Sequence, residues 1–113
     1  MYNNVLAPIF LALLTGSGSA VAAEGKVVIS APHHGAIVSQ QDKVELTYEA
    51  VPGTNGDHLH LNVDGKRLEV IRPMKGKAEV GMLPPGKHHI CLAINTKAHV
   101  PTGTEGCIDI TSK

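Results

Sequence analysis

Apolar residues recur at every second position through most of the chain beyond residue 25, and this is the period of a β-strand. In HLHLNVDG, residues 58–65, the side chains of Leu59, Leu61 and Val63 share one face, and those of His58 and His60 share the other. No segment carries a helical stripe of apolar residues. The pattern predicts an all-β domain with strands at 26–30, 36–39, 43–49, 57–63, 66–71, 77–82, 87–94 and 106–111.

Turn signals separate these segments, and they favour antiparallel neighbours. Asp64-Gly65 between two alternating runs is a strong hairpin signal. Further turn residues stand at 52–53, 55–56 and 84–86. A break at residues 31–35 lets the first strand switch from one sheet to the other. About seven short strands in one domain predict an immunoglobulin-like antiparallel β-sandwich, with a small barrel as the competing architecture.

The first 23 residues have the pattern of a secretory signal peptide. An apolar run from Val5 to Leu14 is followed by small residues ending in AVAA. The run is too short to cross a bilayer as a helix, which takes about 20 residues. We therefore expect a signal peptide at 1–23, a sandwich domain at 24–113, and a mature protein in the periplasm or secreted, with no membrane attachment after cleavage.

Charge and aromatic content narrow the possible partners. The 10 basic and 10 acidic residues balance, and all of them lie after residue 23, as do the seven histidines. A neutral chain has no basic field for nucleic acid and no polybasic patch for a membrane. Tyr48 is the single aromatic residue after position 23, so the core must be aliphatic and thin for a domain of this size.

The two cysteines fall on the predicted outer face of neighbouring strands. Cys91 lies between Ile90 and Leu92, and Cys107 precedes Ile108. Since these apolar neighbours are expected to face the core, both cysteine side chains should point outward. In an oxidising compartment such a pair is expected to form a disulfide, worth roughly 3 kcal/mol for a loop of about 15 residues. The alternative is a pair of thiolates for a soft ion such as Cu(I).

Three histidines are predicted to converge at one end of the sandwich. His58 and His60 project from the same outer face about 7 Å apart, and we expect them to stand in solvent. His99 lies in the loop between the last two strands, which should approach the start of the strand at 57–63. Three imidazoles with an open fourth position suit Cu(II), Zn or Ni.

Other histidines have different expected roles. His33 and His34, at the break in the first strand, are candidates for a fourth metal ligand. Asp57 is a candidate ligand or hydrogen-bond partner of a ligand. His88 shares parity with Ile90, so it should face inward and hydrogen-bond to backbone at the corner after LPPG.

Four segments together resemble a family of small exported bacterial domains of unknown function. They are PHHGAIV, DHLHLNVDG, LPPGKHHICLAI and HVPTG, and they span most of the chain after residue 31. The family is similar to immunoglobulin-like sandwiches, which implies the same fold here. Its motifs point to His58, His60, His88 and His99, and it brings no settled activity. The two cysteines are not part of its pattern.

The leading functional prediction is an exported metal-binding module for copper or zinc, with another periplasmic protein as a further partner. A structural or protein-interaction domain without metal is the alternative. An enzyme resembling copper-zinc superoxide dismutase is a remote third, because the chain has no long zinc loop. No nucleophile motif and no glycine-rich phosphate loop occur either, so we expect no catalysis.

Overall fold

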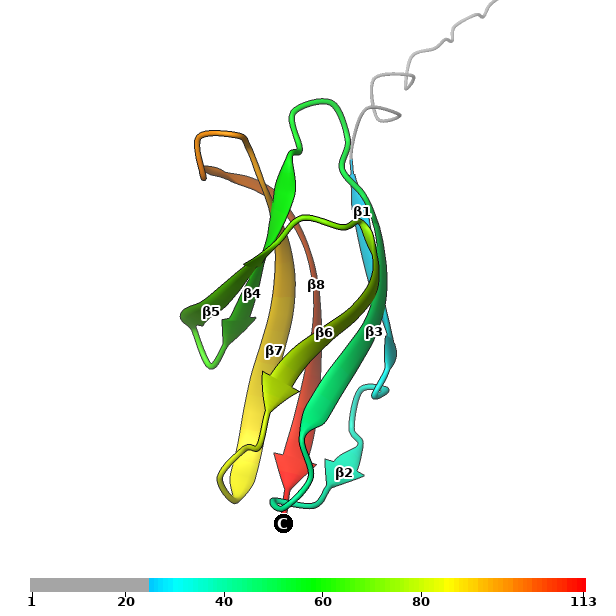
Figure 1. Cartoon of the computed structure of the whole chain (residues 1–113), viewed down its shortest axis with the longest axis vertical. Helices are drawn as coiled ribbons and strands as arrows, with labels where there is room; N and C mark the ends of the chain where they lie inside the picture. The colour runs from blue at the N-terminus through cyan, green and yellow to red at the C-terminus, as the bar shows by residue number, and fades with distance from the viewer. Residues whose placement is uncertain (1–24) are drawn as a thin grey trace, which may run out of the picture.

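A computed structural model describes residues 25–113, and every regular element in that range is a β-strand. The predicted signal peptide lies outside the described residues. No helix among residues 25–113 is long and apolar enough to cross a membrane. The strands run in the order shown in Figure 1: β1 Lys26–Ala31, β2 Ile37–Val38, β3 Val44–Val51, β4 His58–Val63, β5 Lys66–Ile71, β6 Lys75–Gly81, β7 Gly86–Asn95 and β8 Pro101–Ser112.

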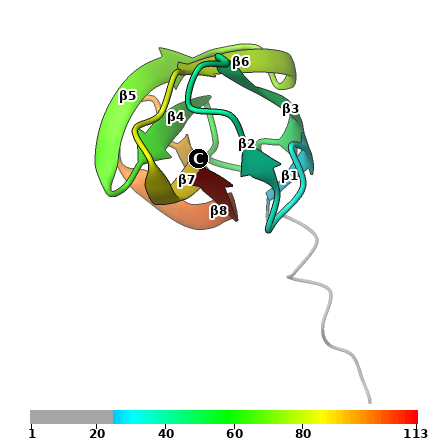
Figure 2. The ribbon, with the colours of Figure 1, turned by 90° about the horizontal axis from the view of Figure 1, so that it is seen from below.

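The strands form two packed sheets, which confirms the predicted immunoglobulin-like sandwich. One sheet has the order β1-β3-β6 and the other the order β2-β8-β7-β4-β5. The end view in Figure 2 shows them as two curved layers. All neighbours are antiparallel except β2 and β8, which are parallel. The break after β1 therefore moves the chain from one sheet to the other, as predicted.

The core between the sheets is aliphatic. Leu46, Leu59, Leu61 and Ile94 are fully buried, and each contributes about 1.5–3 kcal/mol by leaving water. Tyr48 is 3% exposed, and its hydroxyl donates a hydrogen bond to the carbonyl oxygen of Pro73 at 2.7 Å. The alternation in β4 and β7 therefore places the predicted apolar face inward.

The last strand is longer than predicted. β8 begins at Pro101, which pairs with Asn95, so the connection between β7 and β8 shrinks to residues 96–100. Residues 101–105 lack apolar alternation, which is why the sequence pattern assigned them to a loop. They extend the ladder because the antiparallel register with β7 continues through them.

Cys91 and Cys107 form the predicted disulfide. They are direct partners in the register of β7 and β8, and their Cα atoms are 4.1 Å apart. The sulfurs lie on the outer face of the five-stranded sheet, since Ile90 and Leu92 on either side of Cys91 face the core. The bond closes a sequence separation of 16 residues, which is worth about 3 kcal/mol in the chain-entropy account.

Candidate metal centre

His58 and His60 lie on the outer face of β4, where alternation places them. The prediction that they stand in solvent is wrong, because His58 is 0% and His60 9% exposed. Their rings are covered by the turn between β7 and β8, which folds back over this face. The ring centroids of His58 and His99 are 4.4 Å apart, and those of His60 and His99 are 5.4 Å apart.

His99 is held over the two strand histidines by a tight turn. Its amide donates to the carbonyl oxygen of Thr96 at 2.9 Å, and the amide of Thr96 donates to the carbonyl oxygen of Val100 at 2.8 Å. The φ angle of His99 is 66°, in the left-handed region that glycine and asparagine adopt more readily than most residues.

The three rings direct one nitrogen each at a common point. His58 Nε2 lies 3.1 Å from His60 Nε2 and 3.1 Å from His99 Nδ1, and the last two atoms are 3.2 Å apart. A triangle with these edges has a circumradius of about 1.8 Å. An ion bonded to all three nitrogens at about 2.0–2.1 Å would then sit about 1 Å out of their plane, with an open side for further ligands.

Hydrogen bonds among the three facing nitrogens cannot satisfy all of them at once. Each ring nitrogen presents either a hydrogen or a lone pair, so at least two of the three facing nitrogens present the same kind and repel. A bound cation removes the conflict, because it accepts three lone pairs at once. The three nitrogens could therefore hold an ion.

Asp57 orients the first of these rings. The Nδ1–H of His58 donates to Asp57 Oδ2 at 2.9 Å, which leaves the lone pair of His58 on Nε2, toward the cluster. This hydrogen bond is the main cause that lowers the pKa of Asp57, and the positive charges of Arg72 and Lys97 lower it further. Arg72 also contacts the same carboxylate oxygen at 3.5 Å.

The surroundings of His60 favour the neutral form of its ring. Burial lowers the pKa of His60, and repulsion from His58 when that ring is protonated, and from Arg67, lowers it further. A neutral imidazole is the form that binds metal. Asn95 stands beside His58 in the register of β4 and β7, and its Oδ1 is the buried side-chain atom without a partner among residues 25–113.

His33 and His34 do not join the cluster, so their prediction as a fourth ligand is wrong. His34 Nδ1 accepts a hydrogen bond from the amide of Asp109 at 3.0 Å. The carbonyl oxygen of His33 accepts one from the amide of Ala36 at 3.0 Å. In the strand register Asp109 is opposite His89 of β7, whereas His58 is opposite Asn95 of β7. These two positions of β7 are six residues apart. That offset corresponds to about 20 Å along the strand.

The side chain of His88 points inward and has a structural role, as its alternation with Ile90 predicts. It is 8% exposed, and its Nε2–H donates to the carbonyl oxygen of Pro84 at 2.7 Å. Its Nδ1 contacts Asp64 Oδ2 at 2.7 Å. Both partners are acceptors, so both ring nitrogens donate. These hydrogen bonds, that to Asp64 first, raise the pKa of His88, and the backbone amide of His89 together with His88 lowers the pKa of Asp64.

The structure also brings together a second cluster that the sequence reasoning did not assemble. His89, Cys91 and Cys107 place their potential ligand atoms within 4.8 Å of one another on the outer face. The spacing His-x-Cys on one strand, with the second cysteine opposite, is the signal that could have shown it.

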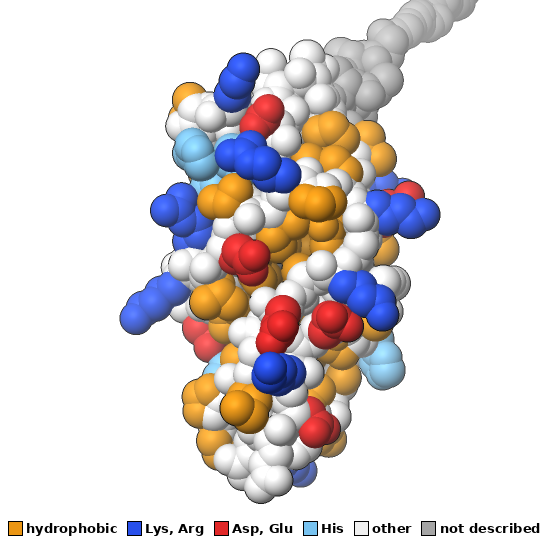
Figure 3. Space-filling model, in the orientation of Figure 1, with side chains coloured by type: hydrophobic (Ala, Val, Ile, Leu, Met, Phe, Trp, Pro, Cys, Tyr) orange, Lys and Arg blue, Asp and Glu red, His pale blue; other side chains and the backbone are white. Residues whose placement is uncertain are grey.

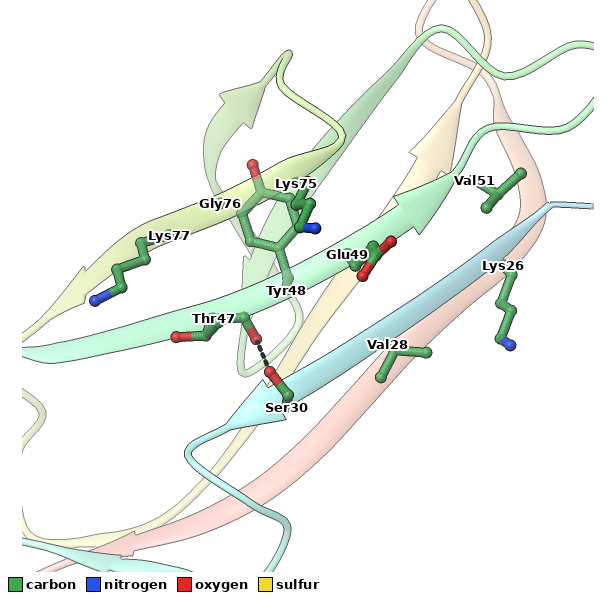
Figure 4. Close-up of a pocket in the computed structure, with 10 residues that line it drawn as sticks. All are labelled: Lys26, Val28, Ser30, Thr47, Tyr48, Glu49, Val51, Lys75, Gly76 and Lys77. Atoms are coloured by element: carbon green, nitrogen blue, oxygen red, sulfur yellow. Dashed lines mark hydrogen bonds between the residues drawn. The ribbon is translucent and has the colours of Figure 1, made fainter.

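A hollow lies elsewhere, on the outer face of β1, β3 and β6. It encloses about 520 Å³ and has an apolar floor that includes Val28 and Val51. Figure 4 shows Lys26, Lys75 and Lys77 at its rim, and a hydrogen bond from Ser30 to the backbone of β3. The residues that line it contain no pairing of a nucleophile with a base, and no exposed aromatic ring is available for stacking.

The three-histidine cluster reaches the surface through His99, which is an exposed residue. Figure 3 shows histidine side chains near the end of the sandwich that carries the turn, with lysine and arginine side chains around them. Arg67 lies near His60, and Arg72 and Lys97 lie near Asp57, so three basic side chains border the opening together with the Asp57 carboxylate.

Comparison with known proteins defines the fold only. No protein-family model matches the chain, and no curated protein sequence matches it. Among solved structures, the chain is similar to the fibronectin(III)-like modules of Clostridium thermocellum CbhA, with a TM-score of 0.63 and 17% identity over 77% of this chain and 96% of that one. It is also similar to the extracellular domain of BT4673 from B. thetaiotaomicron, with a TM-score of 0.59 and 9% identity over 80% of this chain and 16% of that one.

Proposed function

We propose that this protein binds one divalent transition-metal ion, copper or zinc, at the His58–His60–His99 centre, and acts as an exported metal-binding module. The observation that carries the proposal is the nitrogen triangle, with edges of 3.1 to 3.2 Å. Ligands of a tetrahedral ion at about 2.0–2.1 Å lie about 3.3–3.4 Å apart, so a shift of a few tenths of an ångström admits the ion.

Copper(II) is the ion that the ligand set suits best. Imidazole nitrogens bind both copper and zinc, and copper(II) forms the more stable complexes with a given set of nitrogen ligands. The chain offers three imidazoles and no cysteine or methionine ligand at this centre, which favours Cu(II) over Cu(I) here. Zinc would take the same three nitrogens with a water molecule as its fourth ligand.

Binding and transfer fit the centre better than catalysis. With His58 fully buried and His60 9% exposed, a substrate would find little surface beside the ion. Two ligands stand on a central strand, while the third is carried by a turn of five residues. The turn can move away without disturbing β4. All three histidines would then hold the bound ion, and His58 and His60 alone would hold it while it passes to a partner.

We also propose that the protein is periplasmic or secreted. The residues before the domain have the pattern of a signal peptide, and the disulfide suits an oxidising compartment. A periplasmic or secreted protein with an accessible third ligand can pass its ion to another exported protein. The three basic side chains near the opening, Arg67, Arg72 and Lys97, favour an acidic surface on that partner.

A competition titration tests the proposal. Untagged protein is titrated at neutral pH with Cu(II) and with Zn(II) against a chelator of known affinity, and one equivalent should bind with a Kd well below about 10 μM. His60→Ala and His99→Ala should each weaken binding strongly. His33→Ala is the matched control, because His33 lies outside the cluster. Weaker binding than this limit, or unchanged affinity in both cluster variants, would instead support an interaction domain without metal.

A further inference from the structure

The disulfide is one half of a four-residue set on the outer face of β7 and β8. Cys91 pairs directly with Cys107, and His89 pairs directly with Asp109, two residues further along both strands. All four side chains therefore project from the same face, in two adjacent cross-strand pairs. This set shares no residue with the three-histidine centre.

The contacts within the set resemble those of a metal ligand and its orienting partner. His89 Nδ1 contacts Asp109 Oδ1 at 2.7 Å, and His89 Nε2 lies 3.2 Å from Cys91 Sγ. The carboxylate therefore fixes the ring so that Nε2 points at the sulfur. Asp57 orients His58 in the same manner at the first centre.

The exposure of the two sulfurs differs in a way that permits reduction. Cys107 is exposed, whereas Cys91 is 6% exposed beneath its neighbours. An incoming thiolate can reach Cys107 Sγ, and the leaving sulfur is then that of Cys91, next to His89 Nε2. Attack on a disulfide depends on such access and on a stabilised leaving thiolate.

We propose that reduction of this disulfide by a dithiol converts the set into a second metal site, with two sulfurs and one imidazole, for a soft ion such as Cu(I). The thiolate of the reductant bonds to Cys107 Sγ as the Cys91–Cys107 bond breaks, and Cys91 takes up a proton. The second thiol of the reductant then bonds to the first, which releases Cys107 as a thiol. Two electrons and two protons pass from the dithiol to the cysteine pair.

Cu(I) then binds by displacing the two thiol protons. Thiolate sulfur is the donor that Cu(I) prefers, and His89 Nε2 supplies the third ligand. The ligand atoms already lie within 4.8 Å of one another, so small side-chain movements suffice. In the oxidised protein the sulfurs are bonded to each other, and the same residues have no thiolate to offer. The site therefore exists only in one redox state.

The test uses Cu(I) itself under anaerobic conditions. The untagged protein is reduced with a phosphine, which is then removed by anaerobic gel filtration because phosphines also bind Cu(I). It is then titrated with Cu(I) against a chromophoric Cu(I) chelator, while the ultraviolet thiolate-to-copper charge-transfer band is recorded. We expect this band in the reduced protein and none in the oxidised one. Because imidazole gives no such band, the result is independent of the three-histidine centre.

Variants show whether the whole set acts together. His89→Ala and Asp109→Asn should each weaken Cu(I) binding by at least about tenfold, whereas His33→Ala should leave it unchanged. Far-ultraviolet circular dichroism follows the sheet in each sample. The proposal is overturned if the reduced, folded protein gives no sulfur band, if His89→Ala binds like the wild type, or if reduction itself destroys the sheet.

Discussion

Replacing His99 by asparagine should separate stability from metal binding. His99 has a φ angle of 66°, and a residue with an ordinary side chain in the left-handed region carries roughly 1 kcal/mol of backbone strain. Asparagine adopts this region more readily. The change also removes one of three nitrogens that repel one another when no ion is present. We therefore expect the metal-free variant to be as stable as the wild type, or more stable by up to about 1 kcal/mol.

The same change removes one of three ligands from the ion. We expect the affinity to fall at least about 100-fold, which corresponds to about 2.7 kcal/mol. Metal at 100 times the wild-type Kd should stabilise the wild type by about 2.7 kcal/mol, and the variant by less than about 0.5 kcal/mol.

Thermal unfolding with a chelator and with excess metal measures both effects. For a domain of this size 1 kcal/mol corresponds to roughly 4–8 °C in Tm. Val100→Ala, in the same turn, is the control, because the side chain of Val100 is 54% exposed and lies outside the cluster. The reasoning would be refuted if the metal-free asparagine variant lost more than about 1 kcal/mol, or if it bound metal like the wild type.

Three further predictions follow from individual contacts. Asp57→Asn should weaken metal binding about 10–100-fold in a chelator competition, with little change in Tm. The reason is that the asparagine amide can donate to Nδ1 of His58, which moves the proton of the imidazole to Nε2. Unchanged affinity would contradict this prediction. In metal-free protein the His88–Asp64 pair should stabilise most between about pH 3.8 and 6.5, the ordinary pKa values of the two groups. Its contribution should decline as pH rises through the raised pKa of His88, or falls through the lowered pKa of Asp64; urea unfolding across pH should show a flatter profile for Asp64→Asn. Removing the disulfide through Cys107→Ser should cost about 3 kcal/mol in urea unfolding, and a loss below about 1 kcal/mol would count against the loop-closure account.

Side-chain alternation was sufficient to predict the sandwich and one face of each central strand. Leu59 and Leu61 point inward because side chains alternate between the two faces of a strand, and the apolar set must occupy the buried face. The same rule placed Cys91 opposite Cys107, and it placed His88 at the inner corner. These features depend on local sequence and on neighbouring strands, so a single sequence contains them.

The burial of His58 and the position of His34 could not be predicted in this way. His58 is buried because a turn from the far end of β7 folds over it, and that turn depends on the φ angle of a single residue, His99. His34 binds the backbone of β8 instead, because β2 joins that strand in parallel. Alternation describes which face a residue occupies, and it does not describe what covers that face.

The most direct test of the three-histidine centre is anomalous diffraction from crystals grown with copper or zinc. The account predicts a peak about 2.0–2.1 Å from Nε2 of His58, Nε2 of His60 and Nδ1 of His99 together. A peak that involves other residues, or no peak at this position with the ion in excess, would contradict it.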